Sequence, residues 1–216
     1  MPLPSLDIRE LPLFPLPEVV LFPGRPLPLH IFEPRYRMMV NTVMESDRRF
    51  GVLLWNPETE SPMKVGSCAE ILQMQRLPDD RINILTIGQQ RFQVLGIVRE
   101  KPYLVGRVQW ISDEINTAPD PDGLVREVRE LLEDVVRLTA KLTDRQIELP
   151  DSLPTTAVEL SYWIAGNFQG AVEEQQALLE LRDTGKRLRR EAEILESTRK
   201  HLAARTVLKD TLSSIS

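Results

Sequence analysis

Two residues with the chemistry of a nucleophile and a base occur in the first half of the chain, namely Cys68 and His30. A histidine beside a cysteine can activate the thiol for attack on a substrate. However, Cys68 lies in a strand-like pattern without a local histidine, and no acid follows His30 or His201 at a spacing typical of catalytic triads. We therefore expect Cys68 to be a small core residue and His30 to be a structural histidine bonded to backbone.

Nucleotide and metal chemistry lack the residues they need. The Gly185-Lys186 pair is followed by Arg187, and Glu180 stands where a phosphate-binding loop needs its first glycine. One cysteine and two distant histidines do not make a zinc site, and a single cysteine cannot form an intrachain disulfide. We expect no catalytic residue, no cofactor and no metal, and therefore no enzyme.

Charged residues gather at a few other places in the first half. Glu33, Arg35 and Arg37 follow a predicted strand directly, which would suit either a binding pocket or a structural ion pair. We favour the ion pair, because structural pairs are common at such corners. The acidic groups that we interpret as solvated turns, with spacing unlike an EF-hand loop, are Glu58, Glu60, Asp79 and Asp80.

Length and composition indicate an ordinary soluble protein. The 216 residues, 42% apolar and 27% charged, suit one or two compact units with a proper core. Apolar runs such as Val52 to Trp55 are far shorter than the roughly 20 residues of a membrane helix. The first residues lack the pattern of a signal or transit peptide, so we expect a cytoplasmic protein. A net charge of -5 disfavours nucleic acid as a partner.

The segment DEINTAPDPDG, residues 113 to 123, interrupts every regular pattern and predicts a boundary. We expect a β-rich part over 1–118 and a helical part over 119–216. Prolines from Pro12 to Pro28 remove ladder donors, so this segment should wrap around a barrel. The clearest hairpin flanks Pro78-Asp79-Asp80, and Pro34 to Glu45 has the spacing of a helix. The predicted strands are Leu11 to Leu16, Val19 to Phe22, Pro26 to Phe32, Phe50 to Trp55, Gly66 to Leu77, Arg81 to Ile87, Arg91 to Arg99 and Tyr103 to Ile111.

The second half shows helical periodicity throughout. Four helices are predicted: Gly123 to Leu142, Pro154 to Asn167 with Ser152 as a cap, Glu173 to Leu181, and a long one from Asp183-Thr184 to about Arg205. A row of leucines recurs every seven residues at Leu181, Leu188, Leu195 and Leu202. Because the intervening positions are Gly185, Ala192 and Arg199, we favour packing within a bundle over a dimeric coiled coil.

The opening segment, Leu11 to Val40, resembles the start of the N-terminal substrate-binding domain of Lon proteases. Trp163-Ile164-Ala165 and the sequence EEQQALLE resemble the helical part of the same domain, so the likeness extends to about Leu202. It implies an α+β fold, a PUA-like β pseudo-barrel followed by an α-helical bundle that ends in a long helix. The residues that carry the resemblance are Pro12, Leu13, Val20 to Gly24, Pro28, Leu29, Ile31 to Glu33, Arg35, Tyr36, Gly88, Arg91 and Phe92.

In full-length Lon this domain gathers protein substrates, while an ATPase and a Ser/Lys peptidase domain do the chemistry. The resemblance implies a stand-alone relative without those two parts. Gln175 departs from the family, which often has a lysine there. The CxxC pair of cereblon's zinc domain is absent as well, so the adaptor role of that relative is not carried over.

Two functions remain open. The first is a non-catalytic protein- or peptide-binding module, an adaptor or chaperone-like factor in proteolysis, whose apolar surface lies near Met38, Met39 or the N-terminal prolines. Its partners would be unfolded or client polypeptides and a separate protease or chaperone, with the chain a monomer or weak homo-oligomer. The alternative is an RNA-binding PUA-like module. Its basic patch would join Arg35, Arg37, Arg48 and Arg49 beside Phe50. A peptidase is disfavoured, and no substrate-binding residue follows from the sequence.

Overall fold

The computed structural model describes residues 8–114, 120–150, 152–168 and 170–213. Contacts group the chain into two compact units. The first contains the residues up to Ser112 together with Ala165–Arg182, and the second contains Asp113–Ile164 together with the residues from Asp183. Part of the predicted boundary segment, residues 115–119, lies outside the described residues. The division into domains 1–118 and 119–216 stays a prediction.

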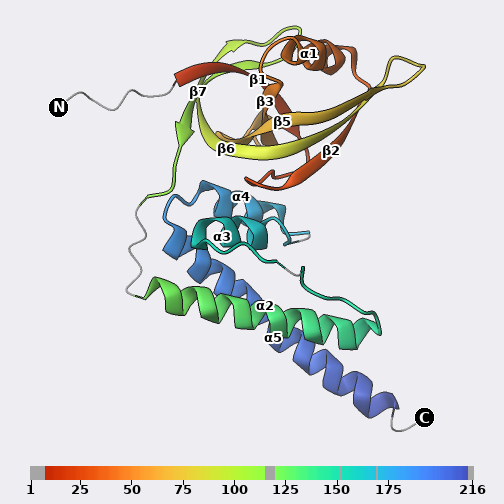
Figure 1. Ribbon diagram of the computed structural model, residues 1–216, viewed down its shortest axis with the longest axis vertical. Helices are drawn as coiled ribbons and strands as arrows, with labels where there is room; N and C mark the ends of the chain where they lie inside the picture. The colour runs from red at the N-terminus through yellow and green to blue at the C-terminus, as the bar shows by residue number, and fades with distance from the viewer. Residues whose placement is uncertain (1–7, 115–119, 151, 169, 214–216) are drawn as a thin grey trace, which may run out of the picture. The chain divides into compact units, whose positions relative to one another are not determined.

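The strands of the first unit form a closed barrel (Figure 1). Neighbouring strands follow the order β1-β7-β6-β5-β3-β4, and β1 also pairs with β3, in parallel, through the register Leu13 to Gly51. This pair closes the sheet, since closure removes the edges that β1 and β3 would otherwise expose. The strands are β1 (Ile8–Leu16), β2 (Pro26–Ile31), β3 (Arg49–Asn56), β4 (Ser61–Pro62), β5 (Val65–Arg76), β6 (Ile82–Arg99) and β7 (Val105–Ile111).

Helix α1 (Pro34–Met44) packs against the barrel, as Figure 1 shows. Its buried residues, Tyr36, Met39, Val40 and Val43, recur at intervals of three and four and join the main hydrophobic cluster of the barrel. Pro34 occupies the first turn, where its missing N–H costs nothing. The helix predicted over 34–45 is thus confirmed.

Two strand predictions were wrong. Residues 19–22 form no strand, because Pro17, Pro23 and the left-handed backbone of Glu18 (φ 56°) surround them, although Leu21 and Phe22 are buried. The two strands predicted over 81–87 and 91–99 are one continuous strand, β6. Gly88 lies within this strand, and its N–H donates to the Arg25 carbonyl while its own carbonyl accepts from Gly24 N–H, both at 2.8 Å.

The second unit is helical, and its two long helices lie side by side (Figure 1). They are α2 (Pro121–Thr143) and α5 (Thr184–Ser213), with most of the short α3 (Ala157–Ala165) in the same unit. Leu188 and Leu195 of α5 are buried, whereas Leu181 lies at the C-cap of α4 (Val172–Glu180), outside α5. The predicted α+β fold is confirmed, with a long helix last in the described chain.

Helix ends follow their capping residues. The Asp120 side chain accepts from Gly123 N–H, so α2 starts at Pro121 instead of Gly123. Asp183 accepts from Lys186 N–H and begins α5, as predicted. The second helix was predicted from Pro154 with Ser152 as its cap, which was wrong. It starts at Ala157, because the Thr156 hydroxyl caps it: the hydroxyl oxygen accepts from Glu159 N–H at 3.2 Å, and the hydroxyl donates to the Glu159 carboxylate at 2.9 Å.

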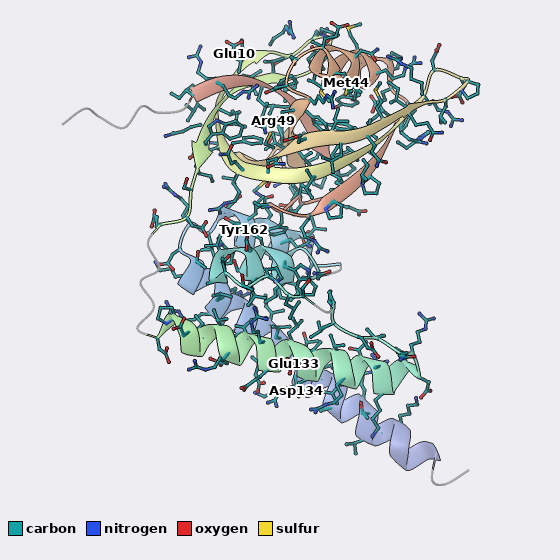
Figure 2. All side chains as sticks on the ribbon, viewed as in Figure 1. Glu10, Met44, Arg49, Glu133, Asp134 and Tyr162 are labelled. Carbon is teal, nitrogen blue, oxygen red and sulfur yellow. The ribbon has the colours of Figure 1, made fainter. Side chains whose placement is uncertain are left out.

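A buried polar cluster ties the second unit together. Arg187, fully buried, pairs with Asp113 and donates from Nε to Ser161 Oγ at 2.8 Å. The Tyr162 hydroxyl donates to the same aspartate at 2.8 Å, and Figure 2 labels this tyrosine. Glu191, one turn further along α5, is buried with no hydrogen-bond partner among the described residues for either carboxylate oxygen. Burial therefore raises the pKa of Glu191 well above its usual range, only partly opposed by the charge of Arg187.

The packing of the barrel leaves no space for a side chain at Gly66. A Cβ at Gly66 would lie 2.1 Å from the Val52 carbonyl oxygen, which is backbone and cannot move cheaply. Gly66→Ala should therefore lower the free energy of unfolding by about 2 to 3 kcal/mol in urea denaturation. Gly96→Ala is the control, since nothing lies within 4 Å of a Cβ there. Equal losses in both variants would contradict this account of the barrel.

Glu191 should make stability depend on pH. Its raised pKa means that the folded chain keeps a proton which the unfolded chain releases, so stability falls as pH rises above the ordinary carboxyl range. Glu191→Gln should raise the thermal midpoint above that of the unsubstituted protein at pH 8. The gap should close near pH 4, where both states of Glu191 are protonated. A gap that is constant with pH would show that Glu191 is ionised in the folded protein.

Candidate functional site

Helix α4 has two faces with different tasks. Leu178 and Leu179 are buried, at 0% and 1% exposure, and fix the inner side of the helix. Glu173, Gln176 and Glu180 recur every three or four residues and so share another face. No side chain caps the N-terminus of α4. The carboxylates of Glu173 and Glu174 in its first turn stabilise the helix through their attraction to the positive end of its dipole.

Arg91 of β6 fastens the C-terminal end of α4 to the barrel. Its Nη1 donates to the carbonyl oxygens of Leu179 and Leu181 at 2.5 Å and 2.7 Å, and the residue is 2% exposed. The last carbonyls of a helix have no partner within the helix, so a cation there supplies both hydrogen bonds and charge. Gln176 adds a second link, donating from Nε2 to the Val65 carbonyl at 3.1 Å.

The end of β3 forms the facing wall. Asn56 Oδ1 accepts from the backbone N–H groups of Glu58 and Thr59, at 2.8 Å and 3.3 Å, which sets the turn after the strand. Asn56 Nδ2 contacts Met63 Sδ at 4.0 Å. The side chain of Asn56 is therefore occupied in shaping the turn that carries Glu58.

A pocket of about 770 Å³ opens between α4 and the end of β3 within the first unit. We call it the α4 pocket. Its lining combines apolar side chains with carboxylates, and no lysine or arginine belongs to it. Such a pocket can hold an elongated ligand that donates hydrogen bonds. The lining residues are Glu18, Leu54, Trp55, Asn56, Pro57, Glu58, Met63, Gly170, Val172, Glu173, Gln176, Ala177 and Glu180.

Sequence reasoning missed most of this pocket. Glu58 was predicted to be a solvated turn residue, and it is exposed, but it also lines the pocket. Glu18, Trp55 and Gln176 were not singled out at all. The spacing of Glu173, Gln176 and Glu180 on one face of the helix was the available signal. Gln175, the departure from the family pattern, donates to the Ala165 carbonyl at 3.0 Å and is not among the lining residues.

The structure does not pair His30 with Cys68. Cys68 is 1% exposed in the barrel core, and burial raises the pKa of its thiol to about 12, so the predicted role as a core residue is confirmed. His30 is exposed on β2, and its Nδ1 bonds the side-chain oxygen of Asn83 at 2.7 Å. The predicted bond of His30 to backbone was therefore wrong, since the neighbouring strand offers this amide oxygen at the surface.

The other charged groups are mostly paired at the surface. Arg35 and Glu33 form the predicted ion pair at 2.8 Å. Arg37 does not join it and instead donates to the Asp80 carbonyl at 3.1 Å. Asp79 pairs with Arg81 at 2.5 Å within the hairpin turn that was predicted. Glu60 lies in an exposed turn, as expected.

The predicted basic patch for RNA is not assembled. Phe50, which would stack on a base, is 0% exposed, because it points into the barrel core. Arg49, labelled in Figure 2, pairs with Glu70 at 2.9 Å, and Arg35 is paired with Glu33. Of the two methionines expected at the surface, Met38 is 51% exposed, but Met39 is fully buried.

The described residues contain neither a metal-binding cluster nor a membrane-spanning helix. There, no three His, Cys, Asp or Glu side chains are arranged to hold a metal ion. No helix among the described residues is both long and apolar enough to span a bilayer.

Comparison with known proteins identifies the family. The model of the ATP-dependent protease La (LON) substrate-binding domain matches residues 10–197. This chain belongs to that family. The barrel is thus the PUA-like barrel of a Lon N-terminal domain, and α4 and its pocket lie within the matched residues.

Relatives of the Lon family cover nearly the whole chain. Lon protease of Roseiflexus castenholzii is 31% identical over 212 residues, which are 93% of this chain and 26% of that protein. Lon protease 2 of Myxococcus xanthus is 29% identical over 204 residues, 91% of this chain and 24% of the relative. The chain therefore spans about a quarter of the length of these curated relatives.

Solved structures agree with this assignment. A Lon N-terminal domain protein from Xanthomonas campestris matches with a TM-score of 0.61 and 26% identity, over 84% of this chain and 95% of that one. The N-terminal domain of the Mycobacterium avium complex Lon protease has a TM-score of 0.65 at 17% identity, over 89% and 98%, and supports the fold.

Arg91 should determine whether α4 stays on the Lon-type barrel. Arg91→Met would remove the donor that serves the carbonyls of Leu179 and Leu181, so the free energy of unfolding should fall by about 3 kcal/mol. Amide hydrogen exchange over Val172–Glu180 should increase more than exchange in β5. Arg99→Met serves as the control, because Arg99 is exposed and lies over the Tyr103 ring. Unchanged exchange in α4 would contradict the fastening role of Arg91.

Proposed function

We propose that this chain is a non-catalytic module that binds extended or unfolded polypeptides. Its membership of a substrate-binding domain family supports the binding of protein substrates. In the described residues, neither the buried thiol of Cys68 nor the exposed ring of His30 has a catalytic partner, which supports a role without bond cleavage. The ATPase and peptidase activities of full-length Lon are not part of the proposal.

The observation that carries the proposal is an open strand edge on the barrel. Within Leu95–Arg99, β6 pairs with β7 on one side at Gly96, Ile97 and Arg99, and the register shifts at the two residues between these pairs. On the other side its pairing with β5 ends at Gln93, and one further bond joins Val94 N–H to the Lys64 carbonyl at 2.8 Å. Within the described part of the chain, no strand pairs with this outer edge of Leu95–Arg99, which we call the β6 edge.

The β6 edge also presents apolar side chains. Leu95, Ile97 and Val98 are 48%, 46% and 45% exposed. An edge with free backbone groups and apolar side chains is a template for a further strand, and proteins usually protect such edges with charge or proline. An extended polypeptide can add to it through backbone hydrogen bonds, which do not depend on the sequence of that polypeptide.

This chemistry suits a factor that handles many clients. Backbone pairing recognises any extended chain, whereas a folded protein has its backbone groups already satisfied. We propose that the chain acts as an adaptor or chaperone-like factor in proteolysis or protein quality control, alongside a separate protease or chaperone. A cytoplasmic location and a monomeric or weakly self-associating state belong to the same proposal.

Two variants test whether the β6 edge is the surface that binds unfolded polypeptides. Leu95→Lys/Ile97→Lys should weaken binding of a labelled, reduced and unfolded model protein about tenfold, because charge and lost apolar contact oppose strand addition. Fluorescence anisotropy measures the dissociation constant. Leu72→Lys is the control, since Leu72 is 50% exposed on β5 and away from the β6 edge.

The outcomes distinguish a failure of the proposed function from a failure of the β6 edge as its binding surface. If the unsubstituted protein forms no complex with the unfolded model protein, the proposed function is wrong. If Leu72→Lys weakens binding and the β6-edge variant does not, the function stands but its surface lies elsewhere.

A further inference from the structure

The α4 pocket differs from the β6 edge in the chemistry it offers. The edge has backbone groups of both kinds, whereas the charged side chains that line the pocket are all carboxylates. We infer that the α4 pocket binds a basic side chain, arginine above all, of a polypeptide held by this module. The inference rests on the proposed function and specifies which class of side chain the bound polypeptide must carry.

Charge is the first support. Glu18, Glu58, Glu173 and Glu180 line the pocket and are exposed. Within the described residues, none of these four glutamates forms an ion pair, although ion pairs are frequent elsewhere on the surface. No lysine or arginine lines the pocket to offset them. A cationic ligand would therefore meet a field that the protein itself does not neutralise.

Gln176 is the second and independent support. It is 3% exposed and lines the pocket, yet its Oε1 has no hydrogen-bond partner in the part of the chain described. Its Nε2 is committed to the Val65 carbonyl at 3.1 Å and to Glu180 Oε1 at 2.8 Å, which fixes the orientation of the amide. A buried acceptor without a hydrogen-bond partner is energetically unfavourable, so it favours a ligand that brings an N–H donor.

The apolar part of the lining fits the rest of such a side chain. Leu54, Trp55 and Met63 provide surface for an aliphatic stem, and an indole face attracts a guanidinium placed over it. A volume of about 770 Å³ admits a long side chain together with part of its backbone. Arginine suits the site better than lysine because its planar head carries five donors, enough to reach several separate acceptors at once.

A divalent cation does not explain the carboxylates. Among the described residues, no three acidic, histidine or cysteine side chains are arranged as a metal site. The glutamates instead come from three separate parts of the barrel unit: the loop after β1, the turn after β3, and α4. Carboxylates from separate segments, with apolar side chains in the same lining, suit an extended organic cation.

The experiment compares two labelled peptides of the same apolar sequence. One carries a central arginine, and the other carries citrulline, which has the same shape but no charge. Fluorescence anisotropy with the unsubstituted protein should show the arginine peptide binding roughly tenfold more tightly. In Glu58→Gln/Glu173→Gln the preference should fall to about twofold, because two of the acceptors lose their charge.

The control has the same change in net charge away from the pocket. Glu45→Gln/Glu100→Gln replaces two exposed glutamates of the same unit that do not line the pocket, and it should keep the full preference. Circular dichroism checks that both double variants are folded. An equal loss of preference in the control would overturn the inference, since it would assign the effect to overall charge.

Other results also decide the question. If both peptides bind equally well, the pocket inference is wrong while the proposed function stands. If neither binds, both are wrong. Spermine serves as a competitor. If spermine, at a concentration comparable to that of the peptides, displaces the arginine peptide and not the citrulline peptide, the pocket is assigned to a free polyamine and the inference is overturned.

Discussion

The site depends on one buried cation, Arg91, and on the carbonyl oxygens at the end of α4 that accept its hydrogen bonds. A guanidinium that is 2% exposed needs acceptors within the protein, and the last carbonyls of α4 need donors that the helix cannot supply. The two needs are met together at Leu179 and Leu181, which lie 88 and 90 positions from Arg91 along the chain. A helix that follows α2 and α3 in sequence is thereby part of the barrel unit. If this contact were lost, α4 would keep its buried leucines and the bond from Gln176 to Val65, but its C-terminal end would lose its link to β6.

The position of α4 then decides which of its residues meet the end of β3. With Leu178 and Leu179 buried, the face that carries Glu173 and Gln176 lines the pocket, while Gln176 reaches the Val65 carbonyl at the start of β5. The closed barrel makes this wall rigid, since the parallel pairing of β1 with β3 holds β3 up to Leu54. The orientation of the Gln176 amide is therefore a result of the fold, because both of its N–H bonds are to groups that α4 and β5 place.

Local patterns in the sequence predicted most elements, and long-range contacts account for what they missed. Helix α1, the turn at Pro78-Asp79-Asp80 and the cap at Asp183 were all predicted, because each signal lies within a few residues. The cap formed by Thr156 and Glu159 was equally local and was overlooked in favour of Pro154. The pocket belongs to another class. Gln176 and Val65 are 111 positions apart, so no periodicity connects them. Residues 19–22 look like a strand by composition, but the turns around them prevent it.

The two proposed surfaces act on different parts of the same ligand. Backbone pairing at the β6 edge distinguishes extended from folded chains but is indifferent to side chains, so by itself it would bind any unfolded segment. The α4 pocket has the opposite selectivity. Its carboxylates distinguish a basic side chain from other side chains, and they do not depend on the conformation of the backbone beyond that side chain. A module with only the first surface would lack selectivity, and one with only the second would bind folded proteins through surface arginines. A ligand that satisfies both must be extended and basic, which is a narrower class than either surface selects alone.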